Sequence, residues 1–207
     1  VRAKAPKGKA AEMQIGGVIY GDAADKAARF ILQCNQKRIP LVFFQDATGF
    51  MVGTRAEQGG IIKDGAKLVN AVANSVVPKI TVVMGNSFGA ANYALCGRAY
   101  DPRLFLAWPT AQIAVMGGSQ AAKTLLSIEE RKLSKQGLEL TDDDRAARLA
   151  EIERRYAEQT SPVYAAARLW VDAIIDPRET RDWLALALEM ADHNPDIEPF
   201  RVGVLQT

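Results

Sequence analysis

Small residues gather in two stretches of this sequence where a ligand could lie against the main chain. The first stretch, residues 48–60, reads TGFMVGTRAEQGG, and the second, residues 87–91, reads SFGAA. Each leads into a predicted helix, and the first turn of a helix leaves amide N–H donors unpaired. Such donors suit the stabilisation of an oxyanion, and one donor contributes about 2.7–4 kcal/mol of transition-state stabilisation.

Side chains that could act as a nucleophile or a general base are few near these turns. The second stretch offers Ser87 and its neighbour Asn86. Neither stretch has the spacing of a P-loop or of a dinucleotide-binding fingerprint, so phosphate binding is not predicted. Glycine-rich turns between a strand and a helix are also common as purely structural features. The ionisable residues near the first stretch, which we expect to be solvated or capping, are Asp46, Glu57, Lys63 and Asp64.

Composition excludes several classes of function. The chain has 207 residues, of which 48% are hydrophobic and 24% charged, and its net charge of +2 does not favour nucleic-acid binding. No apolar run approaches the length of a bilayer span, so membrane insertion is not expected. The single histidine, His193, is interpreted as a surface residue, and Cys34 and Cys96 as buried free thiols. No metal site is therefore expected.

The elements that must position the two stretches alternate between strand and helix. This alternation through residues 17–126 favours right-handed crossovers and a largely parallel sheet. Ligands in such sheets bind beyond the carboxyl ends of the strands, which is where both stretches fall. Strands are predicted at 17–22, 39–45, 77–85, 104–109 and 111–117, and helices at 22–38, 61–75 and 87–97.

Apolar patterns predict how two of these elements are buried. The continuous apolar run 39–45 is typical of a strand buried on both faces. The helix at 61–75 is expected to turn inward Ile62, Ala66, Val69 and either Val72 or Ala73. Residues 46–60 are predicted to be a loop.

The composition and the predicted secondary structure of the chain change after residue 126. Residues 127–159 are charged and helical and are interpreted as a solvated arm, with a subunit-contacting arm as the alternative. Further helices are predicted at 161–177 and 178–192. We expect one domain with a helical C-terminal extension rather than two domains, and residues 1–13 are interpreted as a linker or frayed start.

Four motifs, taken together and in order, closely resemble one family. They are QDATGFMVG, EQGGIIKDGAKLVNAV, the run from VPKITVVMGNSFGAANYALCG to MGGSQAA, and SPVYAAARLWVDAIIDPRETR. The family is the carboxyltransferase β subunits of biotin-dependent acyl-CoA carboxylases, especially those of methylcrotonyl-CoA type. The resemblance implies an α/β crotonase-like (ClpP/crotonase) β-β-α superhelix. It also implies that residues 14–207 are a C-terminal carboxyltransferase domain, with 127–207 as its helical extension.

The resemblance implies carboxyl transfer from carboxybiotin to the α- or γ-carbon of an acyl-CoA of methylcrotonyl, geranyl or propionyl type. Biotin would arrive on a separate carrier domain or subunit, and the substrate would be a coenzyme A thioester. This chain would supply the biotin-side half of the site. Alternatives are a biotin-dependent decarboxylase of glutaconyl- or methylmalonyl-CoA type, or a non-catalytic assembly module when isolated. A biotin-free hydratase would need glutamates near the turn, and residues 84–98 contain none.

The same resemblance assigns roles to individual residues. The main-chain amides of Gly89, Ala90 and Ala91 would hold the ureido oxygen of biotin. Tyr93 matches a position linked to the size of the acyl group, and here it favours a branched or unsaturated one. The residues expected to contact biotin or acyl-CoA are Phe88, Tyr93, Gly49, Phe50, Met51, Gly59, Gly60, Gly117 and Gly118.

Partners are also implied by the resemblance. They are an N-terminal carboxyltransferase domain, a biotin carboxylase and biotin carrier subunit, and further copies of the chain in a dimer to hexamer. The expected location is the cytoplasm of a bacterium or the mitochondrial matrix of a eukaryote.

Overall fold

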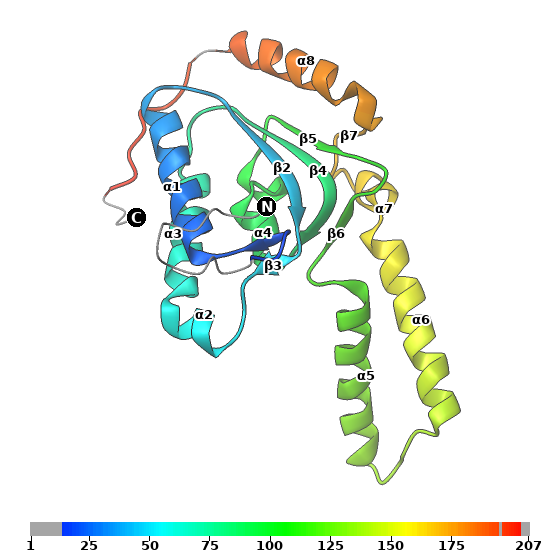
Figure 1. The fold of residues 1–207 in the computed structure, drawn as a ribbon. Coiled ribbons are helices and arrows are strands. Elements are labelled where there is room, and N and C mark those ends of the chain that lie inside the picture. Colours follow the sequence, from blue (N-terminus) through cyan, green and yellow to red (C-terminus); the bar gives the residue numbers. More distant parts are fainter. Residues whose placement is uncertain (1–13, 195, 204–207) are drawn as a thin grey trace.

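A parallel sheet forms the centre of the computed structural model, which describes residues 14–194 and 196–203 (Figure 1). The expectation for residues 1–13 therefore lies outside the described residues. The sheet has the strand order β2-β4-β5-β7, and β6 pairs with the far end of β4. All these pairings are parallel, as predicted. The strands are β2 (Leu41–Ala47), β4 (Lys79–Phe88), β5 (Leu104–Ala107), β6 (Gln112–Ala114) and β7 (Ala173–Ile174).

Strand β4 links two parts of the sheet. Its first half pairs with β2 on one side and β5 on the other, with Ile80 opposite both Val42 and Leu104. Its last residues pair instead with β6, where Phe88 lies opposite Ala114. The strand therefore carries the chain through the buried core and ends where a new helix begins.

The prediction that residues 39–45 are buried on both faces is wrong. Burial alternates along β2, and Val42 and Phe44 are 36% and 46% exposed. Leu41 and Phe43 on the other face belong to the main apolar core. β2 is the edge strand of its sheet, and within the described chain only one of its faces is fully covered.

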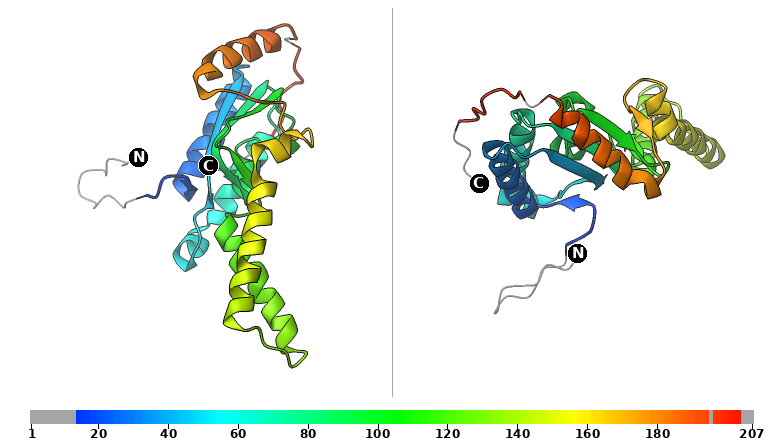
Figure 2. Two further views of the ribbon diagram at one scale, coloured as in Figure 1. Left: turned by 90° about the vertical axis from the view of Figure 1, so that its right-hand side faces the viewer. Right: turned by 90° about the horizontal axis from the view of Figure 1, so that it is seen from above.

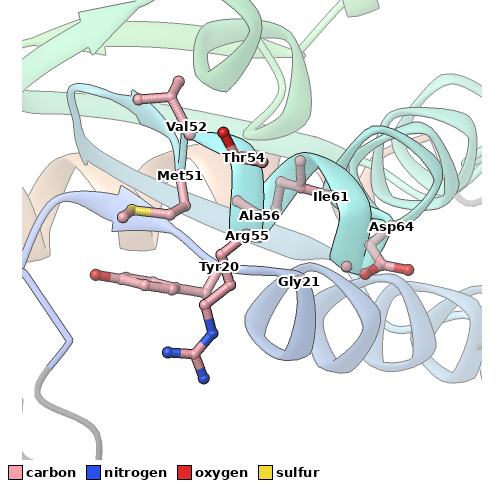
Figure 3. Close-up of a pocket in the computed structure, with 11 residues that line it drawn as sticks. Tyr20, Gly21, Met51, Val52, Thr54, Arg55, Ala56, Ile61 and Asp64 are labelled. Carbon is pink, nitrogen blue, oxygen red and sulfur yellow. The ribbon is translucent and has the colours of Figure 1, made fainter.

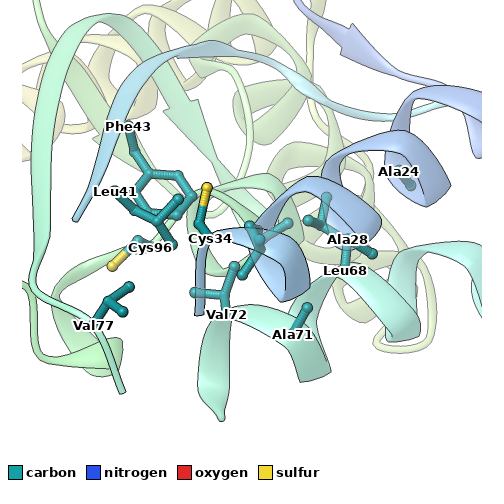
Figure 4. Packing of buried hydrophobic residues seen from close by; sticks show 12 residues of the cluster. Ala24, Ala28, Cys34, Leu41, Phe43, Leu68, Ala71, Val72, Val77 and Cys96 are labelled. Atoms are coloured by element: carbon teal, nitrogen blue, oxygen red, sulfur yellow. The ribbon is translucent and has the colours of Figure 1, made fainter. Parts of the chain in front are cut away.

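Helices α1 (Gly21–Gln36) and α3 (Ile61–Ala73) pack side by side and cover the buried face of β2. Figure 4 shows this core, in which both cysteines are buried and free, as predicted. The buried residues of this cluster are Ala24, Ala28, Ile31, Cys34, Leu41, Phe43, Leu68, Ala71, Val72, Val77, Ala94 and Cys96.

Most of the predicted inward face of α3 is displaced by one position, whereas Val72 is buried, as predicted. Ile61 and Leu68 are buried, whereas Ile62 is 71% exposed. Gly65 faces the core, and the ring of Phe50 lies 3.1 Å from the place its Cβ would occupy. The absence of a side chain at this helix position therefore lets the aromatic ring pack directly against the helix backbone.

Short elements surround the two small-residue stretches. Strands β1 (Val18–Ile19) and β3 (Gly49–Phe50) form a small parallel sheet of their own. The predicted loop 46–60 contains β3 and the helix α2 (Thr54–Gly59). Helix α4 (Gly89–Ala94) is shorter than predicted because β4 continues to Phe88, and the short helix η1 (Arg98–Tyr100) follows it.

A helical hairpin projects from the sheet, and the chain then returns to it (Figures 1 and 2). The hairpin consists of α5 (Gly118–Ser134) and α6 (Asp142–Thr160), with Arg148 and Glu129 paired across it. After it come α7 (Pro162–Ala166), β7, η2 (Pro177–Glu179) and α8 (Thr180–Asp192). The predicted helix 161–177 is therefore wrong beyond Ala166, because the chain there enters β7, which pairs with β5 in the central sheet.

Helix α8 packs on the sheet through Trp183 and Leu184, which contact a buried cluster around Val82 and Leu106. None of the helices among the described residues combines the length and apolar composition needed to cross a bilayer. His193, at the end of α8, is exposed, as predicted.

Candidate functional site

The turn Gly89–Ala91 lies at the end of β4, where helix α4 begins. Gly89 has a φ of +53°, and a Cβ there would lie 2.9 Å from the carbonyl oxygen of Val115, so only glycine fits. Phe88 occupies the N-cap position of α4 and makes no side-chain capping hydrogen bond. Ala90 is exposed, Gly89 is half-buried and Ala91 is buried. The turn therefore reaches the surface at Ala90.

A buried polar network holds this turn from behind. The hydroxyl of Ser87 donates to Oε1 of Gln45 over 2.5 Å and accepts from Nδ2 of Asn92 over 2.7 Å. Nε2 of Gln45 donates to the carbonyl of Leu95 over 2.7 Å. With its hydroxyl engaged in this way and only 1% exposed, Ser87 is placed as a structural residue rather than a nucleophile.

Sequence analysis missed Gln45 and Asn92 as parts of the site. The sequence offered one indication of this role. Gln45 ends the apolar run 39–45, and a buried side-chain amide needs hydrogen-bond partners. Asn92 also packs directly on Gly97, where any side chain would collide with its amide. Gln45 comes from β2, whereas Asn92 belongs to α4 itself, so the bond network between them depends on the fold.

Asp46 fixes the junction between the ends of β2 and β4. Its Oδ1 accepts a hydrogen bond of 3.0 Å from the backbone N–H of Asn86. The same carboxylate lies against Gly85, where a side chain would collide with it. Asp46 thus contacts the backbone shortly before the turn, which is a positioning role.

Glycines at the start of α5 lie beside the turn. A Cβ at Gly117 would lie 3.7 Å from the ring of Phe88, and one at Gly118 would lie 3.6 Å from the ring of Tyr156. Phe88 itself is 5% exposed. The predicted residues Phe88, Gly117 and Gly118 are therefore neighbours of the Gly89 turn, although they are about 30 positions apart in sequence.

Tyr93 lies on the outer side of α4. Its ring is 48% exposed and meets the ring of Tyr100 edge to face, with centroids 5.9 Å apart. This contact orients the Tyr93 ring while leaving much of its surface accessible.

A cavity of about 370 Å³ lies between the start of α1 and the segment from β3 to α3 (Figure 3). Met51 and Gly59 line it, together with Tyr20 and Val52, whereas the turn residues Gly89–Ala91 do not. Figure 3 shows the Met51 and Tyr20 side chains close together at one end and Asp64 at the other. The cavity is therefore a feature distinct from the turn.

The other residues near Met51 that were predicted to contact biotin or acyl-CoA make contacts within the protein or shape its backbone. Phe50 packs its ring on Gly65 of α3, and Gly49 pairs with Val18 in the small sheet. Gly60 ends α2 and precedes α3 with a φ of +96°, which allows one helix to follow the other directly.

Ionisable groups at the cavity are already paired. Asp64 lies 3.0 Å from Nζ of Lys67, which also pairs with Asp25 over 3.0 Å. The hydrogen bonds that Nζ of Lys67 donates to Asp25 and Asp64 raise the pKa of Lys67. Nowhere in the described residues do three or more His, Cys, Asp or Glu side chains form a group suited to a metal ion. The residues of the turn itself, Gly89, Ala90 and Ala91, carry no hydrogen-bond donors other than their main-chain amides.

This combination of fold and turn defines a crotonase-like α/β domain, in which parallel strands and helices present a small-residue turn. Residues 3–202 match the family model described as the carboxyl transferase domain. The chain belongs to this family.

Relatives agree with this assignment. The chain is 49% identical over 179 residues to the biotin-dependent 3-methylcrotonyl-coenzyme A carboxylase beta1 subunit of Mycobacterium tuberculosis, covering 86% of this chain and 34% of that protein. It is 47% identical over 190 residues to the mitochondrial methylcrotonoyl-CoA carboxylase beta chain of Arabidopsis thaliana, covering 92% of this chain and 32% of that protein.

A solved structure gives the same result. The transcarboxylase 12S structure, described as a hexamer with methylmalonyl-coenzyme A and methylmalonic acid bound, superposes with a TM-score of 0.78 at 38% identity. The superposed region covers 89% of this chain and 34% of the transcarboxylase 12S chain. The chain therefore spans about one third of the length of these relatives.

Proposed function

We propose that this chain is the C-terminal carboxyltransferase domain of a biotin-dependent acyl-CoA carboxylase of methylcrotonyl-CoA type. It acts in the transfer of a carboxyl group to the α- or γ-carbon of an acyl-CoA and supplies the biotin-side half of the site. The observation that carries this proposal is the small-residue turn Gly89–Ala91 at the start of α4, exposed at Ala90, in a chain of the carboxyl transferase family.

The turn fits the chemistry that this function requires. Carboxybiotin supplies the carboxyl group, and its departure leaves negative charge on the ureido oxygen. The amides of Gly89 and Ala90 are proposed to donate hydrogen bonds to that oxygen, and Phe88 and the buried Ser87 network keep them in place. Because main-chain donors cannot ionise, this stabilisation needs no titratable group at the turn.

Tyr93 is proposed to face the acyl group. Its half-exposed ring, held against Tyr100, presents an apolar surface beside the turn. A flat aromatic surface suits a branched or unsaturated chain, in agreement with the methylcrotonyl type of the relatives at 49% and 47% identity. Met51 and Gly59 in the neighbouring cavity are proposed to guide biotin towards the turn.

A complete site requires partners. Apolar side chains remain exposed on β2, α1 and α3, including Phe44, Phe30 and Ile62 at 46%, 60% and 71%. These surfaces support contact with an N-terminal carboxyltransferase domain and with further copies in an oligomer of up to six. A separate biotin carboxylase and carrier subunit would deliver the carboxyl group. The proposed location is the bacterial cytoplasm or the mitochondrial matrix.

The proposal is tested by a matched pair of variants at Ala90 in the assembled enzyme, with the N-terminal domain in the same subunit and the biotin-carrying subunit present. Ala90→Pro removes the amide hydrogen and is expected to lower kcat about 100-fold or more, the cost of one oxyanion donor. Ala90→Gly keeps the amide and is expected to retain most activity. Product formation is followed as incorporation of labelled bicarbonate into the acyl-CoA.

Three results would contradict the proposal. Full activity of Ala90→Pro with an unchanged melting temperature would show that the amide has no role. Decarboxylation without carboxylation would favour the decarboxylase alternative. An assembled wild-type enzyme that moves no carboxyl group in either direction would favour an assembly module.

A further inference from the structure

Tyr156 in α6 binds the backbone of the loop that precedes α5. Its Oη donates a hydrogen bond of 2.8 Å to the carbonyl of Met116 and accepts one of 3.3 Å from the N–H of the same residue. One side chain therefore satisfies both main-chain polar groups of Met116. The contact joins positions 40 residues apart, and it ties the base of the helical hairpin to the loop Val115–Gly117.

That loop in turn contacts the Gly89 turn. The carbonyl oxygen of Val115 lies so close to Gly89 that a Cβ there would be only 2.9 Å away. Gly117 lies against the ring of Phe88, and Ala114 pairs with Phe88 in the sheet. The position of the loop therefore limits where the backbone of Gly89 can lie.

We infer that Tyr156 is a positioning residue for carboxyl transfer, whose hydroxyl fixes the loop Val115–Gly117 and, through it, the amides of the Gly89 turn. This inference rests on the proposed function of the turn. Tyr156 does not belong to the turn and is not assigned a contact with substrate. It acts by restricting movement, and displacement of a reacting group by about 1 Å can reduce a rate by about 100-fold.

The ring of Tyr156 strengthens this link. It lies 3.6 Å from the place of a Cβ at Gly118, the first residue of α5. The same side chain thus contacts the start of one hairpin helix, belongs to the other, and binds the loop between β6 and α5. Tyr156 thus adds a side-chain link between the hairpin and the loop to the chain connection at Gly117–Gly118.

The test compares Tyr156→Phe with wild type in the assembled enzyme. Removing the hydroxyl is expected to lower kcat about 10-fold, less than the roughly 100-fold effect of a full 1 Å displacement. The KM for acyl-CoA is expected to be unchanged, because the ring and the binding surfaces remain. Hydrogen–deuterium exchange is expected to become faster in the segments 86–92 and 114–118. This second readout does not require turnover.

Tyr164→Phe is the matched control, because it removes a hydroxyl from a tyrosine of α7 whose ring stacks on Arg168 at 3.3 Å. It is expected to leave kcat and the exchange of both segments unchanged. A loss of activity in both variants would overturn the specific role of Tyr156.

The outcomes separate the inference from the proposed function. If wild type transfers carboxyl groups and Tyr156→Phe keeps its kcat, the inference is overturned and the proposed function stands. A kcat loss without faster exchange at 86–92 also overturns it, since the effect would not pass through the turn. If wild type is inactive, the proposed function fails, and with it the catalytic role of Tyr156. Hydrogen–deuterium exchange would then report only whether the Tyr156 hydroxyl restrains the segments 86–92 and 114–118.

Discussion

The hydroxyl of Ser87 lies 2.5 Å from Oε1 of Gln45, and this bond joins the end of β4 to β2 inside the core. Asn92 completes the arrangement by donating to the same hydroxyl over 2.7 Å. Ser87 is two residues before Gly89, so the polar network supports the turn from its buried side. Networks of this kind are costly to break because each remaining partner is left unsatisfied.

Ser87→Ala is expected to destabilise the domain. It leaves Oε1 of Gln45 and Nδ2 of Asn92 without this partner in a buried site, which costs about 1–3 kcal/mol of the free energy of unfolding. Urea denaturation measures the change. Thr124→Ala, which removes an exposed hydroxyl bonded to Gln120 in α5, serves as the control and is expected to change stability by less than about 0.5 kcal/mol. Equal effects of the two variants would contradict a special role for the network.

Two glycine-to-alanine substitutions are expected to act in opposite directions. Gly89→Ala places a Cβ at a φ of +53° and 2.9 Å from the Val115 carbonyl oxygen, and should cost about 1–3 kcal/mol of stability. Gly59→Ala meets no atom within 4 Å in helix α2 and should add about 0.4–1 kcal/mol. Thermal unfolding of both variants provides the measurement. A stabilised Gly89→Ala protein would show that the turn relaxes freely.

Tyr93→Leu is expected to change acyl selectivity in the assembled enzyme. Loss of the aromatic surface should raise the ratio of kcat/KM for propionyl-CoA over methylcrotonyl-CoA by about 10-fold, the low end of what pocket shape achieves. Tyr100→Leu removes the stacking partner but leaves the Tyr93 ring, and is expected to change the ratio less. Competition assays with both substrates measure it. An unchanged ratio for Tyr93→Leu would remove Tyr93 from the acyl site.

The free energy of unfolding is expected to decrease in alkaline solution because the thiol of Cys96 is buried. Burial raises the pKa of its thiol, which is 0% exposed. As pH rises past the ordinary range of a cysteine, the unfolded chain releases this proton while the folded chain keeps it. The folded state then binds more protons, so the free energy of unfolding decreases with pH until the raised pKa is reached.

Denaturation at pH 7.5 and 9.5 tests this dependence. Cys96→Ala lowers stability at both pH values by creating a cavity, but it is expected to show a smaller decrease between them. An identical decrease in both proteins would assign the alkaline sensitivity to other groups.

Several features of this protein could be predicted from the sequence alone. Alternating strand and helix patterns predicted a parallel sheet, and the small residues at 87–91 predicted a turn between a strand and a helix. Both predictions depend on local chemistry, since apolar runs form strands and glycine permits a positive φ. The family resemblance rested on the same local motifs and was confirmed by the match over residues 3–202.

Other features were decided by packing between distant segments. Ile62 is exposed and Leu68 is buried, and the Phe50 ring packs on Gly65 of the same inward face of α3. Phe44 is half-exposed because its face of β2 is not fully covered within the described chain, which an apolar run does not reveal. Sequence patterns indicate which residues tend to be buried, but they do not indicate which segment of the chain covers them.

The support of the turn illustrates the same division. The sequence by itself determined that Gly89, Ala90 and Ala91 form a turn with little side-chain chemistry. Only the tertiary structure decided that Gln45, Ser87 and Asn92 hold it from the core and that Tyr156 reaches its neighbouring loop. A hydrogen bond depends on distance and direction in space, and these are set once the sheet and the hairpin bring separate segments together.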